Sequence, residues 1–302
     1  MSMVTDEKSF YDISRRVLGI LLLAGAMPQL SYPSIVVNPE VEADAIEHEG
    51  VPFPMASVHG LPRSQLRKLV DEFNSKQPSR KKWVFLSLIN TSQKSVISGE
   101  VSVIVQFVRS LRHISARQNE DQSRIPFPHR KPYVLVSYIS MTAPYHCELL
   151  VDATIKQYAY AVEKGWVLNS SDMCFPVRAG DDAHDIRTEA NLTKYLFESI
   201  CVIPVNWPVA VTGTGSSHII DFGPGGETGF GSLTFRNVKG RGVPVICAGS
   251  LTARTESPLG TKADLFREHL DDVIVAADWE HDYKPQLVRT SHDGAIHIDT
   301  RF

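Results

Sequence analysis

Apolar positions follow two alternating periods between residues 51 and 139. Residues 51–58 are apolar and β-rich. Apolar side chains then recur at the spacing of one helix face, at Leu66, Leu69, Val70 and Phe73. Strand-like runs at 83–89 and 95–98, a second helical face over 101–111 and a last strand at 133–139 complete the pattern. The order β-α-β-β-α-β over residues 51–139 predicts a ferredoxin-like subdomain.

Helices and strands also alternate outside this segment. Residues 7–27 predict one helix that becomes fully buried at its end, whereas 38–50 is a polar, acidic connector without a period. Later in the chain, the predicted elements are a helix at 149–163, a strand at 173–177, a helix at 190–201 and, after a glycine-rich loop at 213–217, a buried strand at 218–222. This alternation predicts an α/β layer.

The domain organisation follows from these two patterns. We expect residues 1–50 and 140–260 to form the α/β core, with residues 51–139 inserted as the ferredoxin-like subdomain. Residues 261–302 are expected to form a C-terminal helix and a linker segment.

Composition and cysteine content limit the binding partners and the cellular compartment that can be expected. A net charge of −3 gives no electrostatic case for nucleic acid or for an acidic membrane surface. The four cysteines contain no C-x-x-C pair, which favours reduced thiols and a cytoplasmic location over a zinc site or a disulfide framework. An apolar run at 17–27 follows Arg15 and Arg16, but acidic residues precede it, so a buried helix is the better interpretation and a signal peptide the alternative.

The stretch "APYHCELL", residues 143–150, carries the first candidate chemistry. It places the imidazole of His146 directly before an apolar helical run, where a general base is often found. A histidine with purely structural hydrogen bonds is the alternative. Cys147 is adjacent in sequence and points elsewhere from a helix start, so we interpret it as structural.

Other motifs give weaker signals. The glycines between Asp221 and Leu233 could approach a phosphate, but no Lys-Ser/Thr follows them, and their spacing does not fit a dinucleotide fingerprint. The serines of "GTGSS" precede a strand, whereas a nucleophile elbow needs a strand-to-helix turn. The acidic loop at 180–185 lacks calcium-loop spacing, so no metal site is expected.

Several segments together resemble a known family. They are "DQSRIPFPHRK", "APYHCELL", "HIIDFGPGGETGFGSLTFRN", "GVPVICAGSL" and "EGVPFPM", with the "N…VISG" pair at Asn90 and residues 96–99. The chain, from about residue 7 to its end, resembles the acetyltransferase (starter acyltransferase) domain of the fungal fatty acid synthase β subunit. This resemblance implies a hydrolase-like α/β acyltransferase core with an inserted ferredoxin-like subdomain.

The resemblance also implies a mechanism. A serine in a G-x-S-x-G elbow takes an acetyl group from coenzyme A and passes it to the phosphopantetheine arm of an acyl carrier domain. His146 matches the general base, which takes the serine proton. Asn90 and Gly223 fall in matching segments and are expected to line the substrate site. Ala24 stands where malonyl-handling relatives carry an arginine, so a neutral short acyl group is expected; a plain helix-core alanine is the alternative.

One departure limits the functional interpretation. None of the 302 residues forms a G-x-S-x-G elbow, so the chain is expected to be the later part of a domain whose serine half is missing. The first hypothesis is an acyltransferase that works with a polypeptide supplying the serine, or with fatty acid synthase subunits. The alternative is a non-catalytic remnant that binds coenzyme A, a carrier domain or synthase subunits. Thioester hydrolysis ranks last, and whether the chain is itself an enzyme stays open.

Overall fold

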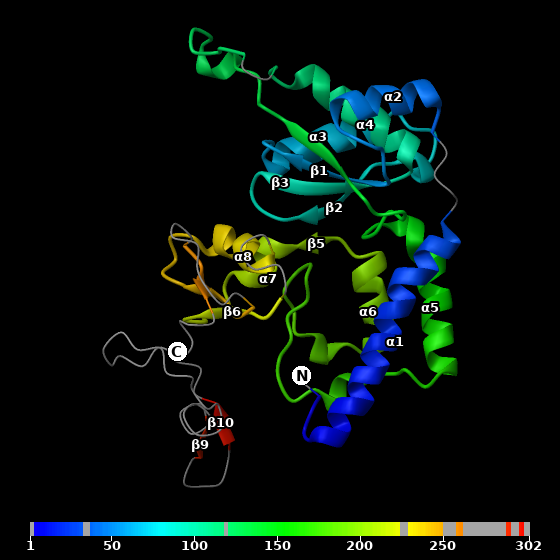
Figure 1. The fold of residues 1–302 in the computed structure, drawn as a ribbon, viewed down its shortest axis with the longest axis vertical. Coiled ribbons are helices and arrows are strands. Elements are labelled where there is room, and N and C mark those ends of the chain that lie inside the picture. The colour runs from blue at the N-terminus through cyan, green and yellow to red at the C-terminus, as the bar shows by residue number, and fades with distance from the viewer. Residues whose placement is uncertain are drawn as a thin grey trace. The chain divides into compact units, whose positions relative to one another are not determined.

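The computed structural model describes residues 3–32, 37–117, 120–223, 229–249, 258–261, 288–290 and 296–298. The chain divides into two compact units, residues 1–210 and 211–302, and each is described by itself. Figure 1 shows the course of the chain and the labels used below.

A five-stranded sheet with two covering helices forms one part of the first unit. The strand order is β4-β1-β3-β2-β5, with antiparallel neighbours except for the parallel pair β2 and β5. Its elements in chain order are β1 (Met55–His59), α3 (Arg63–Asn74), β2 (Phe85–Ile89), β3 (Lys94–Ser98), α4 (Val101–Ile114), β4 (Leu135–Ile139) and β5 (Val205–Asn206). The predicted order of strands and helices over residues 51–139 is confirmed.

The core of this part lies between the sheet and the helices α3 and α4 (Figure 1). Leu66 and Val70 of α3 and Ile104 and Leu111 of α4 are almost completely buried, as their helical spacing predicted. An amphipathic helix that buries such a stripe against a sheet gains most of its stability from that packing.

Three helices build the other part of the first unit. They are α1 (Glu7–Ser31), α5 (Val151–Glu163) and α6 (Leu192–Cys201). Their apolar side chains form one cluster that includes Ile20, Leu23, Ala161 and Phe197. All three helices were predicted, and α1 runs four residues further than expected.

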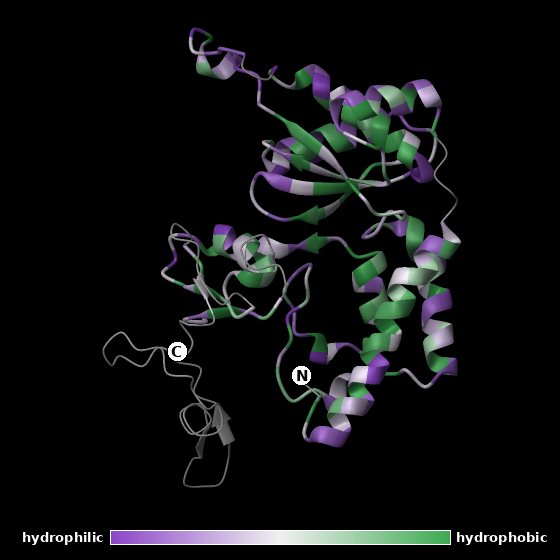
Figure 2. Cartoon of the chain, viewed as in Figure 1, coloured by the Kyte–Doolittle hydropathy of each residue, from purple (hydrophilic) through white to green (hydrophobic). Residues whose placement is uncertain are grey.

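The long helix α1 begins at a capping box and exposes part of its apolar surface. The Asp6 carboxylate accepts the Ser9 N–H at 2.7 Å, and the Asp6 N–H donates to the Ser9 hydroxyl at 3.0 Å. Figure 2 shows the helix changing from a hydrophilic first turn to a hydrophobic later part. Leu18, Leu22 and Leu30 are each at least 65% exposed. By length and composition alone, α1 is the one helix among the described residues that could cross a bilayer.

Three expectations for the first unit are wrong. The helix over 7–27 does not become fully buried at its end, because Leu21 and Leu22 are 52% and 67% exposed. The connector at 38–50 contains a helix, α2 (Pro39–His48), because the Asn38 side chain accepts the Glu40 N–H and a proline occupies the first helical position. Residues 173–177 form no strand. Phe175 and Val177 are exposed there, and the proline between them has no N–H for a ladder.

Short helices complete the connections. They are η1 (Arg80–Lys82), η2 (Phe127–His129), η3 (Glu148–Leu150), η4 (Ser170–Asp172), η5 (Ile186–Thr188) and α7 (Trp207–Val211).

Among its described residues, the second unit contains a small parallel sheet, the helix α8 (Phe230–Val238) and an antiparallel strand pair. The sheet has the order β6 (Ile219–Asp221), β7 (Val245–Cys247) and β8 (Gly260–Thr261), and α8 lies between β6 and β7 in the chain. The strand β6 was predicted, but its expected burial is wrong, because Ile220 is 41% exposed. The helix expected within 261–302 falls outside the described residues, which there include the antiparallel pair β9 (Val288–Thr290) and β10 (Ile296–Ile298).

Candidate active site

His146 lies in the short connection between β4 and η3, in an unusual backbone conformation. Its φ of 57° is in the left-handed region, which a residue with a Cβ rarely adopts. The flanking residues Ala143, Tyr145 and Leu150 are buried in one apolar cluster with Cys201. Such strained positions persist only where surrounding packing imposes them, and they are concentrated at functional sites.

The hydrogen bond of the imidazole fixes its tautomer. Nδ1 lies 3.0 Å from the backbone carbonyl oxygen of Ile203. A carbonyl only accepts, so Nδ1 carries the proton and the neutral ring keeps its lone pair on Nε2. Burial lowers the pKa of His146 below its usual value, while the carbonyls of Ile203 and Ser199 act in the opposite direction. The ring is therefore a neutral base near pH 7.

Cys147 does not share this chemistry. Its Sγ–H donates to the Pro144 carbonyl at 2.9 Å, and the residue is only 2% exposed. Burial raises the pKa of its thiol to about 12. Because the thiolate is the reactive form, the predicted structural role of Cys147 agrees with its surroundings.

An ion pair connects the turn after His146 to the residues before β2. Arg80 Nε and Nη2 bind the two carboxylate oxygens of Glu148 at 2.6 and 2.5 Å. The guanidinium carbon also lies 4.6 Å from the ring centroid of Trp83. Lys82 pairs with Glu100. Two of the three cations in the basic run at 80–82 are thus paired with acids of this chain.

The other residues predicted for the site lie in different surroundings. Ala24 is 3% exposed within the α1 packing cluster, so its methyl group is part of the helix core. Asn90 lies in the turn between β2 and β3, where its N–H donates to the Lys94 carbonyl at 2.9 Å. Gly223 lies in the second unit, and its N–H donates to Asp221 Oδ1 at 2.8 Å. Their contacts with substrate stay predictions.

Asp221 gives the glycine-rich motif a defined structural role. Its second carboxylate oxygen accepts the Gly231 N–H at 2.7 Å, in the first turn of α8. One side chain therefore holds both ends of the loop between β6 and α8. A Cβ at position 231 would lie 2.4 Å from Cys247 Sγ, which explains the glycine there.

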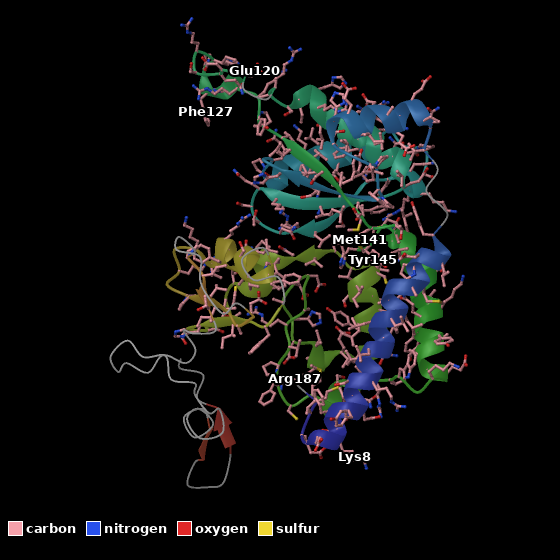
Figure 3. All side chains as sticks on the ribbon, in the orientation of Figure 1. Lys8, Glu120, Phe127, Met141, Tyr145 and Arg187 are labelled. Carbon is pink, nitrogen blue, oxygen red and sulfur yellow. The ribbon has the colours of Figure 1, made fainter. Side chains whose placement is uncertain are left out.

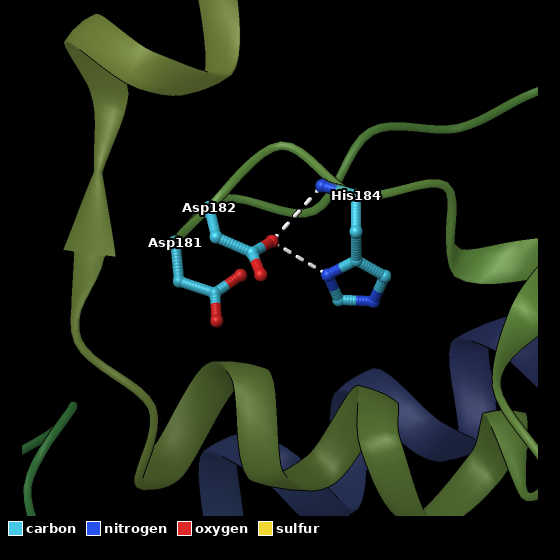
Figure 4. A group of neighbouring side chains, drawn as sticks. All are labelled: Asp181, Asp182 and His184. Atoms are coloured by element: carbon cyan, nitrogen blue, oxygen red, sulfur yellow. Dashed lines mark hydrogen bonds and ion pairs between the residues drawn. The ribbon is translucent and has the colours of Figure 1, made fainter.

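One cluster outside this site has a spacing that could suit a metal. Figure 4 shows Asp181, Asp182 and His184, whose ligand atoms lie within 4.8 Å of one another. His184 Nδ1 is 2.6 Å from Asp182 and Nε2 is 2.7 Å from Glu189. The hydrogen bond with Asp182 is the main cause that raises the pKa of His184, so the imidazolium itself neutralises these acids. The geometry is that of an ion-paired histidine.

Sequence reasoning found His146 but missed two contacts in its surroundings. One is the Ile203 carbonyl, which has no sequence signature. The other is the hydroxyl of Tyr145, which contacts the backbone of α1 (labelled in Figure 3). Pro28 inside α1 was an available signal for the second, because a proline leaves one helix carbonyl without its usual donor.

Comparisons with known proteins show which proteins the chain is similar to. Residues 8–133 match the family described as starter unit:ACP transacylase in aflatoxin biosynthesis. The fatty acid synthase subunit beta of Saccharomyces cerevisiae is 32% identical over 297 residues, which is 98% of this chain and 14% of that subunit. The Schizosaccharomyces pombe subunit is 34% identical over 304 residues, again 14% of its length.

Solved structures show the same fold. A malonyl-CoA:acyl carrier protein transacylase from Xanthomonas oryzae is similar with a TM-score of 0.52 and 19% identity, over 75% of this chain and 59% of that one. The FabD structure from Acinetobacter baumannii gives a TM-score of 0.53 at 18% identity, covering 76% of this chain and 60% of that one. The α/β architecture is thus that of an acyltransferase. Residues 8–133 thus match the starter acyltransferase family, and nearly the whole chain is similar to a segment of fungal fatty acid synthase β subunits.

Proposed function

We propose that this chain supplies the histidine part of an acyltransferase site that moves a short acyl group from coenzyme A to an acyl carrier protein. The observation that carries the proposal is the Nδ1 contact of His146 with the Ile203 carbonyl, which leaves the lone pair on Nε2. The match of residues 8–133 to the starter unit:ACP transacylase family supports the reaction class. It favours this function over the non-catalytic alternative.

The chemistry needs a serine from residues outside this sequence, because none of the 302 residues forms a G-x-S-x-G elbow. Nε2 of His146 would take the serine proton as Oγ forms a bond to the thioester carbonyl carbon. The C–S bond then breaks, and the coenzyme A sulfur leaves with the proton returned by the imidazolium. The same steps in reverse order would load the thiol of the carrier's phosphopantetheine arm.

Two further assignments belong to this proposal. Residues 51–139 would be the inserted ferredoxin-like subdomain, supported by the antiparallel strand order β4-β1-β3-β2 and by two helices packed on the sheet. The exposed leucines of α1 would be covered by the polypeptide that carries the serine, since apolar surface of this kind marks an interface. The proposal also includes a cytoplasmic location. It assigns to Ala24 the preference for neutral acyl groups, and to Asn90 and Gly223 contacts with the substrate.

The test is a hybrid in which this chain replaces the matching 297 residues of the Saccharomyces cerevisiae subunit. After incubation with acetyl-CoA, intact-mass measurement and peptide mapping should find acetyl on the elbow serine. A His146→Ala hybrid should be acylated about 10²- to 10⁴-fold more slowly, the range expected for a lost general base.

The isolated chain is the matched control and should take up no acetyl group. A folded hybrid that is not acylated, or one whose rate does not depend on His146, would contradict the proposed function.

A further inference from the structure

Helix α1 contains one backbone carbonyl that its own helix cannot satisfy. Pro28 lies inside the helix and has no N–H, so the carbonyl of Ala24, four residues earlier, lacks its usual donor. Ala24 is 3% exposed, and water is therefore not a ready substitute. A buried carbonyl of this kind needs a partner from elsewhere in the protein.

The hydroxyl of Tyr145 is that partner. Its oxygen lies 3.1 Å from the Ala24 carbonyl and 3.2 Å from the Gly25 carbonyl, so its single proton is shared between two acceptors. Tyr145 is 6% exposed, and burial raises the pKa of its hydroxyl, which keeps the proton in place. The contact spans more than a hundred residues of sequence.

Tyr145 directly precedes His146, so this contact fixes one side of the strained residue. The other side is fixed by Cys147, whose N–H donates to the Cys201 carbonyl at 3.2 Å. Between these two anchors, the backbone of His146 is held at a φ of 57°. The imidazole then meets the Ile203 carbonyl at 3.0 Å. Loss of one anchor would release the strain and move the ring.

We infer that Tyr145 is a positioning residue for His146, and that it acts by binding the α1 carbonyl that Pro28 leaves free. The inference rests on the proposed role of His146 as the general base. Its alternative is a tyrosine that only stabilises the packing of α1. A positioning role predicts that loss of the Tyr145 hydroxyl changes the tautomer and pKa of His146 even when the stability of the protein is restored. A purely stabilising role predicts no such change.

The test compares the unmodified 302-residue chain with four variants by nitrogen NMR of the histidine rings. His146→Gln identifies the signals of His146. Tyr145→Phe removes only the hydroxyl and should reduce the share of the Nδ1–H tautomer. The measured pKa of His146 should rise toward its usual value, since a released ring is more exposed to water.

A double variant separates positioning from stability. Pro28→Ala in the Tyr145→Phe background restores an N–H at position 28, which can bind the Ala24 carbonyl within the helix. We expect the thermal midpoint to recover while the His146 signals stay perturbed. Tyr138→Phe is the matched control, because its buried hydroxyl oxygen has no hydrogen-bond partner among the described groups, and it should leave His146 unchanged.

Two results would overturn the inference. One is a His146 tautomer and pKa that are the same in Tyr145→Phe as in the unmodified chain. The other is full recovery of both in the double variant, which would show that the hydroxyl acts through helix stability alone. Neither readout requires acyl transfer, so failure of the hybrid would count against the proposed function and leave this inference standing.

Discussion

Two glycines within α1 provide a matched test of how tightly this helix packs. Replacing a glycine inside a helix by alanine normally stabilises it by about 1 kcal/mol. At Gly25 an added Cβ meets nothing within 4 Å. At Gly19 the same atom would lie 2.5 Å from Cδ2 and Cε3 of Trp166, closer than real Cβ contacts allow.

The two substitutions are therefore expected to change the free energy of unfolding in different directions. Gly25→Ala should raise the free energy of unfolding by about 1 kcal/mol. Gly19→Ala has the same helix gain, but the ring of Trp166 must move, and overpacking of this kind costs about 1–3 kcal/mol. Because the helix gain cancels in the comparison, the Gly19→Ala variant should be the less stable of the two by about 1–3 kcal/mol.

Thermal unfolding followed by far-UV circular dichroism measures this difference. In a unit of this size, each kcal/mol shifts the midpoint by about 2–4 °C. Fluorescence provides a second probe, because the ring of Trp166 should change its surroundings only in the Gly19→Ala variant. Equal or greater stability of Gly19→Ala would refute the close packing of α1 on Trp166.

Two further predictions follow from single side chains. Cys174 is exposed, whereas Cys147 is buried and its thiol has a raised pKa. A thiol reagent at pH 8 should therefore label Cys174 quickly and Cys147 only on unfolding, as peptide mapping would show. Rapid labelling of Cys147 in the folded chain would contradict its burial. The pKa of His184 is raised by Asp182 and Glu189, so its stabilising effect should be complete below pH 6.5 and be lost as the pH rises through the higher folded value. His184→Gln should remove this part of the pH dependence of the thermal midpoint, and an unchanged profile would exclude the ion pair.

The elements with strong apolar periods were predictable from the sequence. Leu66 and Val70, and likewise Ile104 and Leu111, are spaced so that each pair lies on one face of its helix, and all four are buried as expected. The helix α2 was missed because Ala45 is its one fully buried residue, so no apolar stripe marked it. Its signals were a capping asparagine and a proline, which indicate a helix start without any period.

The site was predictable only in part, for a physical reason. His146 could be found because its neighbours form a recognisable motif. The group that sets its tautomer is the backbone carbonyl of Ile203, and every residue type carries such a carbonyl. Tyr145 could be read as apolar or polar from its sequence position, and only the fold shows that its hydroxyl reaches Ala24.

The short segment from Cys201 to Asn206 connects the loop around His146 with the five-stranded sheet of the first unit. The Cys201 carbonyl accepts the N–H of Cys147, and the Ile203 carbonyl accepts from the ring of His146. Val205, two residues further, is paired with Leu88 of the sheet. The two residue steps from Ile203 to Val205 can span about 7 Å at most, so these two contacts cannot move far apart. We therefore expect a displacement of the sheet along β5 to reach the imidazole of His146, so that the rigidity of the sheet governs how precisely this ring is positioned.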